Sequence, residues 1–266
     1  MKRTIPFISI ALVCIVLLSA GKKPLTVYMA GDSTMADRLD TTITPERGWG
    51  QVFPTFLSED VIVKNYAMNG RSTRSFIEEG RWQQIVSQLH RGDVVIIQFG
   101  HNDTKQTDPR RYTPISAYEE NLSKMIQEAR KKGARPILCT PIARRYFSKE
   151  TGELVNRHGG YVDAARRVAQ AEKVPLIDLN TMTSEWLRRE GDSNSIQYFC
   201  HIPAGRYSKY PEGKTDNTHL CEAGALVVAQ MAAEAIQEQG IKSFKNRIVL
   251  NRNKVLYTTP ARTEKE

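Results

Sequence analysis

Short apolar runs that alternate with amphipathic stretches constrain the fold of this 266-residue chain more than any other feature. The runs are rich in Val and Ile and continuous, which is typical of parallel strands that are covered on both faces. The stretches between them repeat apolar residues every three or four positions, as amphipathic helices do. We therefore expect strands over 25–30, 61–67, 93–99, 135–140 and 174–179, and helices over 81–90, 115–132, 160–172 and 222–239. This order predicts an α/β domain with a helix-covered parallel sheet.

The sequence predicts one domain only. No internal repeat, low-complexity tract or Pro/Ser-rich linker interrupts it. Residues 191–215 are rich in Gly, Ser, Tyr and Pro and are expected to form a long loop, which in such a domain often carries function. We expect a leader over 1–21, the domain over 22–250 and a polar tail over 251–266.

The leader has the pattern of a secretory signal peptide. Lys2 and Arg3 precede an apolar run over 5–18, and small residues follow at 19–21. The run is shorter than the ~20 residues of a membrane-spanning helix, so a cleaved signal is favoured over a membrane anchor. The mature protein is therefore expected to be exported, periplasmic or extracellular, without stable insertion in the membrane.

Charge and cysteine content narrow the class of partner. The formal net charge is +9, and loss of Lys2 and Arg3 with the signal brings it to +7. This charge suits a uronic-acid polysaccharide, but by itself it does not distinguish an acidic glycan from nucleic acid or anionic lipid.

The three cysteines that follow the leader, Cys139, Cys200 and Cys221, lack the spacing of a zinc site. Cys139 is expected in the core, and the pairing of the other two stays open.

Three chemically suggestive residues follow predicted strands, where ligands bind in open parallel sheets. Ser33 ends a Gly-Asp-Ser segment and is either a helix cap or a nucleophile whose own N–H faces an oxyanion. Gly70 is either a turn glycine or a residue whose N–H is open to a ligand. Asn102, in Gly-His-Asn-Asp, either forms an Asx turn or offers its amide to an oxyanion.

A fourth motif precedes the last predicted helix. Asp216 lies three residues before His219, and in a helical turn its carboxylate would reach Nδ1 and leave Nε2 to accept a serine proton. Alternatively, Asp216 caps the helix and His219 is a surface residue. Each motif alone is weak, but together they supply a nucleophile, oxyanion donors and an oriented base, the parts that acyl transfer requires.

With these four blocks the sequence closely resembles the SGNH (GDSL-like) hydrolases from about residue 26 to 239. The segments "GDSTMAD", "NYAMNGRSTRSF", "QFGHND" and "DNTHLCEAGA" are most similar to the rhamnogalacturonan acetylesterase family. The resemblance implies a three-layer α/β/α sandwich of flavodoxin-like type with about five parallel strands. It also implies an SGNH hydrolase domain over 22–250 and an esterase that uses neither a metal nor an organic cofactor.

The resemblance further implies a role for each block. Ser33 would be the nucleophile, His219 the general base and acid, and Asp216 the carboxylate that orients it. The N–H groups of Ser33 and Gly70 and the side-chain amide of Asn102 would bind the oxyanion.

The motifs constrain substrate recognition less. His101, Arg71 and Arg74 are candidates for substrate binding, and Arg144 and Arg145 lie in or near a loop where they could meet carboxylates. Each arginine is equally explained as a solvated surface charge, and His101 could instead only hold its loop.

The sequence thus predicts an exported carbohydrate esterase that hydrolyses O-acetyl groups of a pectic polysaccharide, in particular rhamnogalacturonan. Its partner would be an acetylated acidic polysaccharide or oligosaccharide, and not a nucleic acid. The alternatives are an acetylesterase for xylan or another neutral glycan, a lipase or thioesterase, and a noncatalytic glycan-binding protein. The four intact blocks disfavour the last of these.

Overall fold

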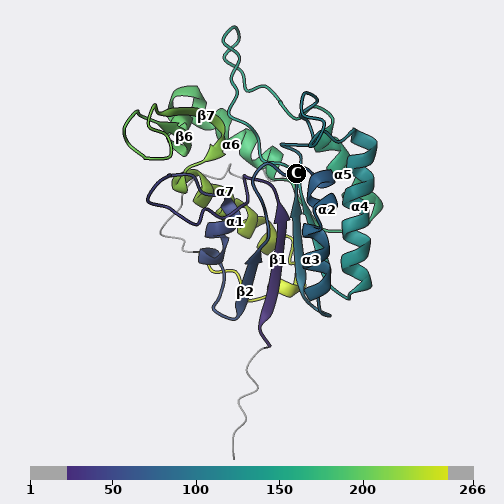
Figure 1. Ribbon diagram of the computed structural model, residues 1–266. Helices are drawn as coiled ribbons and strands as arrows, with labels where there is room; N and C mark the ends of the chain where they lie inside the picture. Colours follow the sequence, from purple (N-terminus) through teal and green to yellow (C-terminus); the bar gives the residue numbers. More distant parts are fainter. Residues whose placement is uncertain (1–22, 251–266) are drawn as a thin grey trace, which may run out of the picture.

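A five-stranded parallel sheet forms the centre of the protein (Figure 1). The computed structural model describes residues 23–250, so the expected signal peptide and polar tail lie outside the described residues. The strand order is β2-β1-β3-β4-β5. The strands are β1 (Leu25–Gly31), β2 (Val61–Asn65), β3 (Val94–Gln98), β4 (Arg135–Cys139) and β5 (Leu176–Ile177). The expected sheet is therefore confirmed.

Helices cover both faces of this sheet, which confirms the α/β/α sandwich (Figure 1). One face packs against α2 (Thr73–Glu78), α3 (Arg81–Gln88), α4 (Ile115–Lys131) and α5 (Tyr161–Ala171). The other face packs against α1 (Trp49–Val52), α6 (Leu179–Ser195) and α7 (Glu222–Glu238). Three short 3₁₀ helices complete these layers: η1 (Phe53–Phe56), η2 (Ile196–Tyr198) and η3 (Lys242–Phe244).

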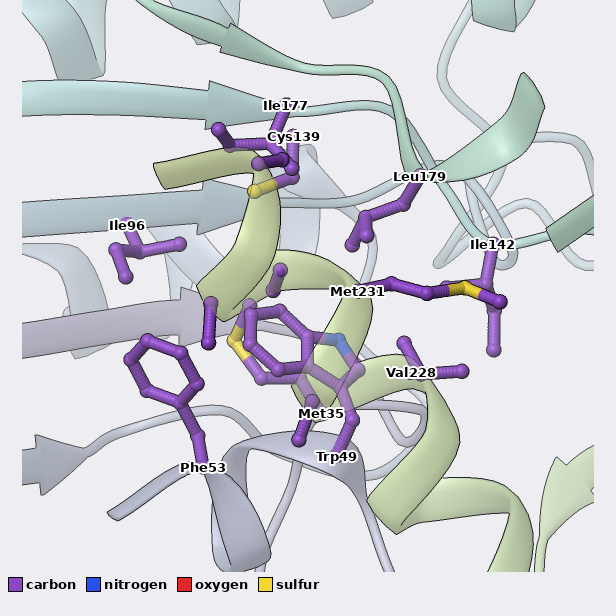
Figure 2. Close-up of a cluster of buried hydrophobic side chains, with 14 of the residues drawn as sticks. Met35, Trp49, Phe53, Ile96, Cys139, Ile142, Ile177, Leu179, Val228 and Met231 are labelled. Carbon is purple, nitrogen blue, oxygen red and sulfur yellow. The ribbon is translucent and has the colours of Figure 1, made fainter. Parts of the chain in front are cut away.

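An apolar core lies on each side of the sheet, and β1 supplies both. Val27 and Met29 point into the core beneath α7, whereas Tyr28 and Ala30 point into the core beneath α3 and α4. Successive side chains of a strand point to opposite faces, so a strand with two cores needs a continuous apolar run. In Figure 2, Trp49 and neighbouring side chains of the first core pack between the strands and α7. Full burial of a large apolar side chain contributes about 1.5–3 kcal/mol.

The segment 191–215 differs from the long loop that the sequence predicts. Helix α6 continues to Ser195 through a bend at Gly191, where φ is 73°. Strands β6 (Phe199–Ile202) and β7 (Lys214–Leu220) then form an antiparallel pair, so only the residues between them form a loop. The prediction was wrong because the buried side chains of β6 and the pairing with β7, not Gly and Pro content, determine the local structure.

Two further details concern the cysteines and the membrane. Cys139 is buried in the core, as expected, while Cys200 and Cys221 are free thiols. The Cys200 Sγ donates to the Leu220 carbonyl at 3.3 Å, and the Cys221 Sγ donates to the Gln197 carbonyl at 3.0 Å. Across residues 23–250, no helix combines the length and apolarity needed to cross a bilayer.

Candidate active site

The ends of three neighbouring strands and the end of β7 meet at one cleft of about 450 Å³. Ser33 follows β1, Gly70 follows β2, and Asn102 follows β3, while Asp216 and His219 belong to β7. All five residues line this cleft. The fold therefore brings together the residues that the sequence motifs singled out.

Ser33 lies in a tight turn directly after β1. The Asp32 carbonyl accepts hydrogen bonds from the N–H groups of Met35 at 3.2 Å and Ala36 at 3.0 Å, and the Arg38 guanidinium donates to the Ser33 carbonyl at 3.1 Å. Ser33 does not cap a helix, because among residues 23–250 the first helix begins at Trp49. Ser33 is only 7% exposed, so its hydroxyl is accessible from the cleft alone.

A chain of buried hydrogen bonds connects this turn to the apolar core. Asp32 Oδ1 accepts from the backbone N–H and the hydroxyl of Thr34, at 2.9 and 2.8 Å. The Thr34 hydroxyl accepts from Gln98 Nε2 at 2.7 Å, and the side-chain oxygen Oε1 of Gln98 accepts from Trp49 Nε1 at 2.6 Å. Because every member is buried, the turn around Ser33 is held in one conformation.

His219 lies between Ser33 and Asp216. Its Nε2 is 2.9 Å from Ser33 Oγ, and its Nδ1 is 2.6 Å from Asp216 Oδ2. The pair belongs to β7, so the expected helical turn is wrong. Asp216 Oδ1 instead accepts the backbone N–H groups of Thr218 at 2.8 Å and His219 at 2.9 Å, which turns the local chain and brings the carboxylate to the ring.

Sequence reasoning missed a charged group that supports Asp216. Lys214 Nζ lies 2.9 Å from Asp216 Oδ2 and also contacts the carboxylate of Glu46. Tyr210 donates to Glu46 Oε1 at 2.7 Å, and Arg38 Nε lies 3.1 Å from Glu46 Oε2. These side chains come from two segments that lie far apart in the chain, residues 38–46 and 210–216, so no short motif contains them. The position of Lys214, two residues before Asp216, was the only local signal.

These contacts explain why the two carboxylates stay ionised. Burial by itself would raise the pKa of Asp216, but the hydrogen bond and charge of His219, with the contact to Lys214, hold it well below its usual value. Burial likewise opposes ionisation of Glu46, yet Lys214 and Tyr210 lower its pKa to about 2.

The same residues could in principle hold a metal ion, since Glu46, Asp216 and His219 each offer one metal-ligand atom within 4.8 Å of the others. These atoms already contact Lys214 or one another.

The loops that carry Gly70 and Asn102 are bonded to each other. Gly70 has φ = 76°, a conformation that favours glycine. Asn102 Nδ2 donates to the Arg71 carbonyl at 3.0 Å, and Asp103 Oδ1 accepts the N–H and hydroxyl of Thr73 at 2.9 and 2.6 Å. Burial raises the pKa of Asp103 to about 7. The separation between the Gly70 N–H and the Asn102 amide is therefore fixed by side chains adjacent to both.

His101 lines the cleft, but its ring is almost completely buried. It is 2% exposed, its Nδ1 lies 3.4 Å from Asp32 Oδ2, and its ring packs edge-on against His158 with centroids 4.6 Å apart. Burial lowers the pKa of His101, although the Asp32 carboxylate acts in the opposite direction. The ring is thus positioned to support the turn at Asp32 and offers little surface to a sugar.

The candidate arginines divide into two groups. Arg71 and Arg74 pair with Glu79 at 2.9 Å and Glu78 at 2.8 Å, and neither is among the described residues that line the cleft. Arg145 is buried and donates to Asn217 Oδ1 at 2.8 Å, whereas Arg144 does line the cleft. The sequence also gave no reason to select Lys105 and Arg111, which line the cleft in the loop after β3.

Comparison with known proteins agrees with this geometry. Residues 29–224 match the sequence model of the GDSL-like Lipase/Acylhydrolase family. Rhamnogalacturonan acetylesterase RhgT of Bacillus subtilis (strain 168) is 41% identical over 233 residues, which are 88% of this chain and 98% of that protein. Probable rhamnogalacturonan acetylesterase YesY of the same organism is 37% identical over 216 residues, or 81% of this chain and 94% of that one.

A solved structure extends the similarity to three dimensions. The crystal structure of protein YxiM from Bacillus subtilis has a TM-score of 0.70 and 29% sequence identity, over 83% of this chain and 58% of that chain. The resemblance drawn from the four sequence blocks is confirmed: this chain belongs to the GDSL-like lipase/acylhydrolase family.

Proposed function

We propose that the protein is an acetylesterase that hydrolyses O-acetyl groups of a pectic polysaccharide, rhamnogalacturonan in particular. One observation carries this proposal: His219 forms a hydrogen bond to Ser33 Oγ through Nε2 and to Asp216 through Nδ1. The two Bacillus relatives named as rhamnogalacturonan acetylesterases support the substrate class, since the similarity extends over most of both chains.

In the proposed reaction, His219 Nε2 takes the proton of Ser33 as Oγ attacks the acetyl carbonyl carbon. The tetrahedral intermediate then expels the sugar oxygen, which receives that proton from His219. Water, deprotonated by His219, attacks the acetyl-serine ester, and acetate leaves as Ser33 recovers its proton. Asp216, kept anionic by its contacts, stabilises the imidazolium that forms in both steps.

The oxyanion of each intermediate would be bound by the N–H groups of Ser33 and Gly70 and by the amide of Asn102. The Asn102 amide has two hydrogens, and the Arg71 carbonyl engages one of them. The other hydrogen is left for the substrate oxygen. Donors that are already fixed before the reaction contribute most to catalysis, and the bonds between the two loops meet this requirement.

The composition of the cleft favours a short acyl group over a long one. Its described lining consists of Gly70 and polar or charged side chains, and Tyr210 is the only Phe, Tyr or Trp among them. A long acyl chain would therefore bury its methylene groups against polar atoms, which contributes little to binding. This favours acetyl esters over the lipase and thioesterase alternatives.

The proposal is tested by acetate release from acetylated rhamnogalacturonan and acetylated xylan, together with a chain-length series of p-nitrophenyl esters. We expect acetate from rhamnogalacturonan, less from xylan, and higher kcat/KM for acetyl than for octanoyl esters. A preference for octanoyl would favour a lipase. Binding to pectin without release of acetate would favour a noncatalytic protein.

Export belongs to the same proposal. We infer a signal peptide over residues 1–21, a hydrolase domain over 22–250 and a polar tail over 251–266, since a polysaccharide is encountered outside the cytoplasm. Expression of the full chain in a bacterial host, followed by N-terminal sequencing of the protein outside the cytoplasm, tests this. A product that retains Lys2 and Arg3 would contradict it.

A further inference from the structure

The charges that line the cleft separate into two groups. Around His219, the lining contains two carboxylates, Glu46 and Asp216, which contact the lining cations Arg38 and Lys214. Around Gly70 and Asn102 the lining contains Lys105, Arg111 and Arg144, and no carboxylate is among the described residues of that lining. The lining beside the proposed oxyanion donors therefore presents three cations to the cleft, and the carboxylate that pairs with Arg111, Asp108, lies behind that lining.

Lys105 is the least compensated member of this second group. Its side chain is partly buried, and within residues 23–250 its ammonium has no assigned hydrogen bond or ion pair. Burial lowers the pKa of Lys105, and the charges of Arg111 and Arg144 lower it further, although the carboxylates of Asp32 and Asp108 act in the opposite direction. An ammonium that is partly removed from water and repelled by two guanidinium groups is unfavourable, and a bound anion would relieve that repulsion.

Arg111 extends from the same loop over the glycine of the site. Its Nε pairs with Asp108 Oδ2 at 3.1 Å, which fixes one edge of the guanidinium. The guanidinium carbon lies 3.4 Å, and the two terminal nitrogens 3.5 and 3.6 Å, from where a Cβ on Gly70 would be. The absence of a side chain at Gly70 thus leaves the terminal nitrogens of Arg111 at the floor of the cleft.

Arg144 approaches from the loop after β4. Its Nη2 donates to the His101 carbonyl at 2.8 Å, and its Nε is buried without a hydrogen-bond partner among the described residues. Burial lowers the pKa of Arg144, although it stays cationic. The terminal nitrogen Nη1 makes no hydrogen bond to a described residue, so the guanidinium that lines the cleft has a donor left for an anionic ligand.

We propose that Lys105, Arg111 and Arg144 form a carboxylate-binding subsite that holds a uronate residue of the polysaccharide while its ester group lies at Ser33. Guanidinium groups bind carboxylates through paired hydrogen bonds. A carboxylate in this part of the cleft would be attracted by all three cations. The subsite would select acetylated acidic glycans over acetylated neutral ones. This inference rests on the proposed acetylesterase function and adds the residues that determine specificity.

The test compares two substrates that differ only in charge. Acetylated rhamnogalacturonan oligosaccharides are assayed beside the same oligosaccharides with their carboxyl groups reduced to alcohols, and kcat/KM is measured for each. The native protein is expected to prefer the acidic form. Arg111→Gln and Lys105→Met are each expected to lower this preference about tenfold or more, as expected for loss of a hydrogen bond to a charged group.

Arg110→Gln is the matched control. Arg110 adjoins Arg111 in the same loop, but its side chain is 86% exposed and does not line the cleft. This variant is expected to keep the native preference. The preference of the native protein should also fall as salt is added, because ions screen the attraction between partly exposed charges.

Other outcomes would contradict the inference in distinguishable ways. A native protein that releases acetate from neither oligosaccharide contradicts the proposed function itself, whereas equal rates on both forms contradict only the carboxylate subsite. Equal losses in Arg111→Gln on both forms would assign Arg111 to acyl transfer and overturn the inference. Sodium acetate is tested as an inhibitor of p-nitrophenyl acetate hydrolysis. Weaker inhibition in the variants with unchanged preference would assign the cations to the released acetate and also overturn it.

Discussion

His219 Nε2 lies 2.9 Å from Ser33 Oγ, although 186 residues separate the two positions in the chain. Ser33 is held by the turn after β1 in the central sheet, and His219 by β7 in the separate two-stranded sheet. The contact therefore depends on how the two sheets are placed relative to each other, and not on either motif alone. Local opening of the β6–β7 pair is expected to abolish activity before the central sheet unfolds.

Ser33→Ala is expected to reduce kcat for p-nitrophenyl acetate by at least about 10⁴-fold, because the attacking oxygen is lost. The melting temperature should change little, since alanine fits the space of serine. Ser87→Ala removes an exposed hydroxyl from α3 and is the control. Native-like turnover by Ser33→Ala would refute the proposed mechanism.

Asp216→Asn is expected to lower kcat by about 10³-fold or more, because the amide cannot stabilise the imidazolium and disturbs its tautomer. Steady-state kinetics on p-nitrophenyl acetate provide the measurement. Asp163→Asn changes an exposed carboxylate on α5, which pairs with Arg166, and should keep full activity. If Asp216→Asn retains kcat within about threefold, Asp216 does not orient the base.

Gly70→Ala and Gly80→Ala separate backbone strain from catalysis. Both glycines have similar positive φ, 76° and 71°, so each substitution should lower the free energy of unfolding by about 1 kcal/mol. A Cβ at Gly70 would contact Arg111 inside the cleft, whereas one at Gly80 would meet nothing within 4 Å. We expect a loss of kcat/KM in Gly70→Ala alone. Chemical denaturation and ester hydrolysis of both variants check this, and equal activities would contradict it.

Glu46→Gln is expected to lower the free energy of unfolding near pH 7 by roughly 3 kcal/mol, because Arg38 and Lys214 lose a buried anionic partner. The pKa of Glu46 is about 2 in the folded protein, against a reference value of 4.5. Its contribution is therefore complete above the reference value and is lost as the pH falls toward 2. Urea denaturation of both proteins over this acid range should show a shallower pH dependence for the variant. Parallel profiles would contradict this assignment.

The central sheet could be predicted from the sequence, because strands that are buried on both faces appear as continuous apolar runs. The five apolar runs all contain strands, although β5 is limited to Leu176–Ile177 within the expected 174–179. Helix α4 (Ile115–Lys131) agrees with the expected 115–132, since its apolar residues repeat over several turns. Helices α1 and α2 were not expected because four and six residues are too short for a periodic signal.

Helix α6 was missed although its sequence contains a usable signal. Asp178 caps it by accepting from the N–H of Thr181, and Leu179, Met182, Trp186 and Leu187 follow at helical spacing. At the site, Ser33, Gly70, Asn102, Asp216 and His219 were predictable because each lies in a short motif. Lys105, Arg111 and Glu46 were not, because only tertiary contacts bring them to the cleft.

The loop that carries Lys105 and Arg111 is closed at its base. The Thr113 N–H donates to the Asp103 carbonyl at 3.1 Å, and the Tyr161 hydroxyl donates to the Thr113 carbonyl at 2.6 Å. The two ends of the loop 104–112 are therefore held together. The loop is also separate in the chain from the segments that hold Ser33 and His219. Surface loops tolerate changes in sequence and length better than the elements they connect, so we expect that residues 104–112 can be replaced as a unit, with a change of glycan preference in the proposed esterase and no change in the contacts between Ser33, His219 and Asp216.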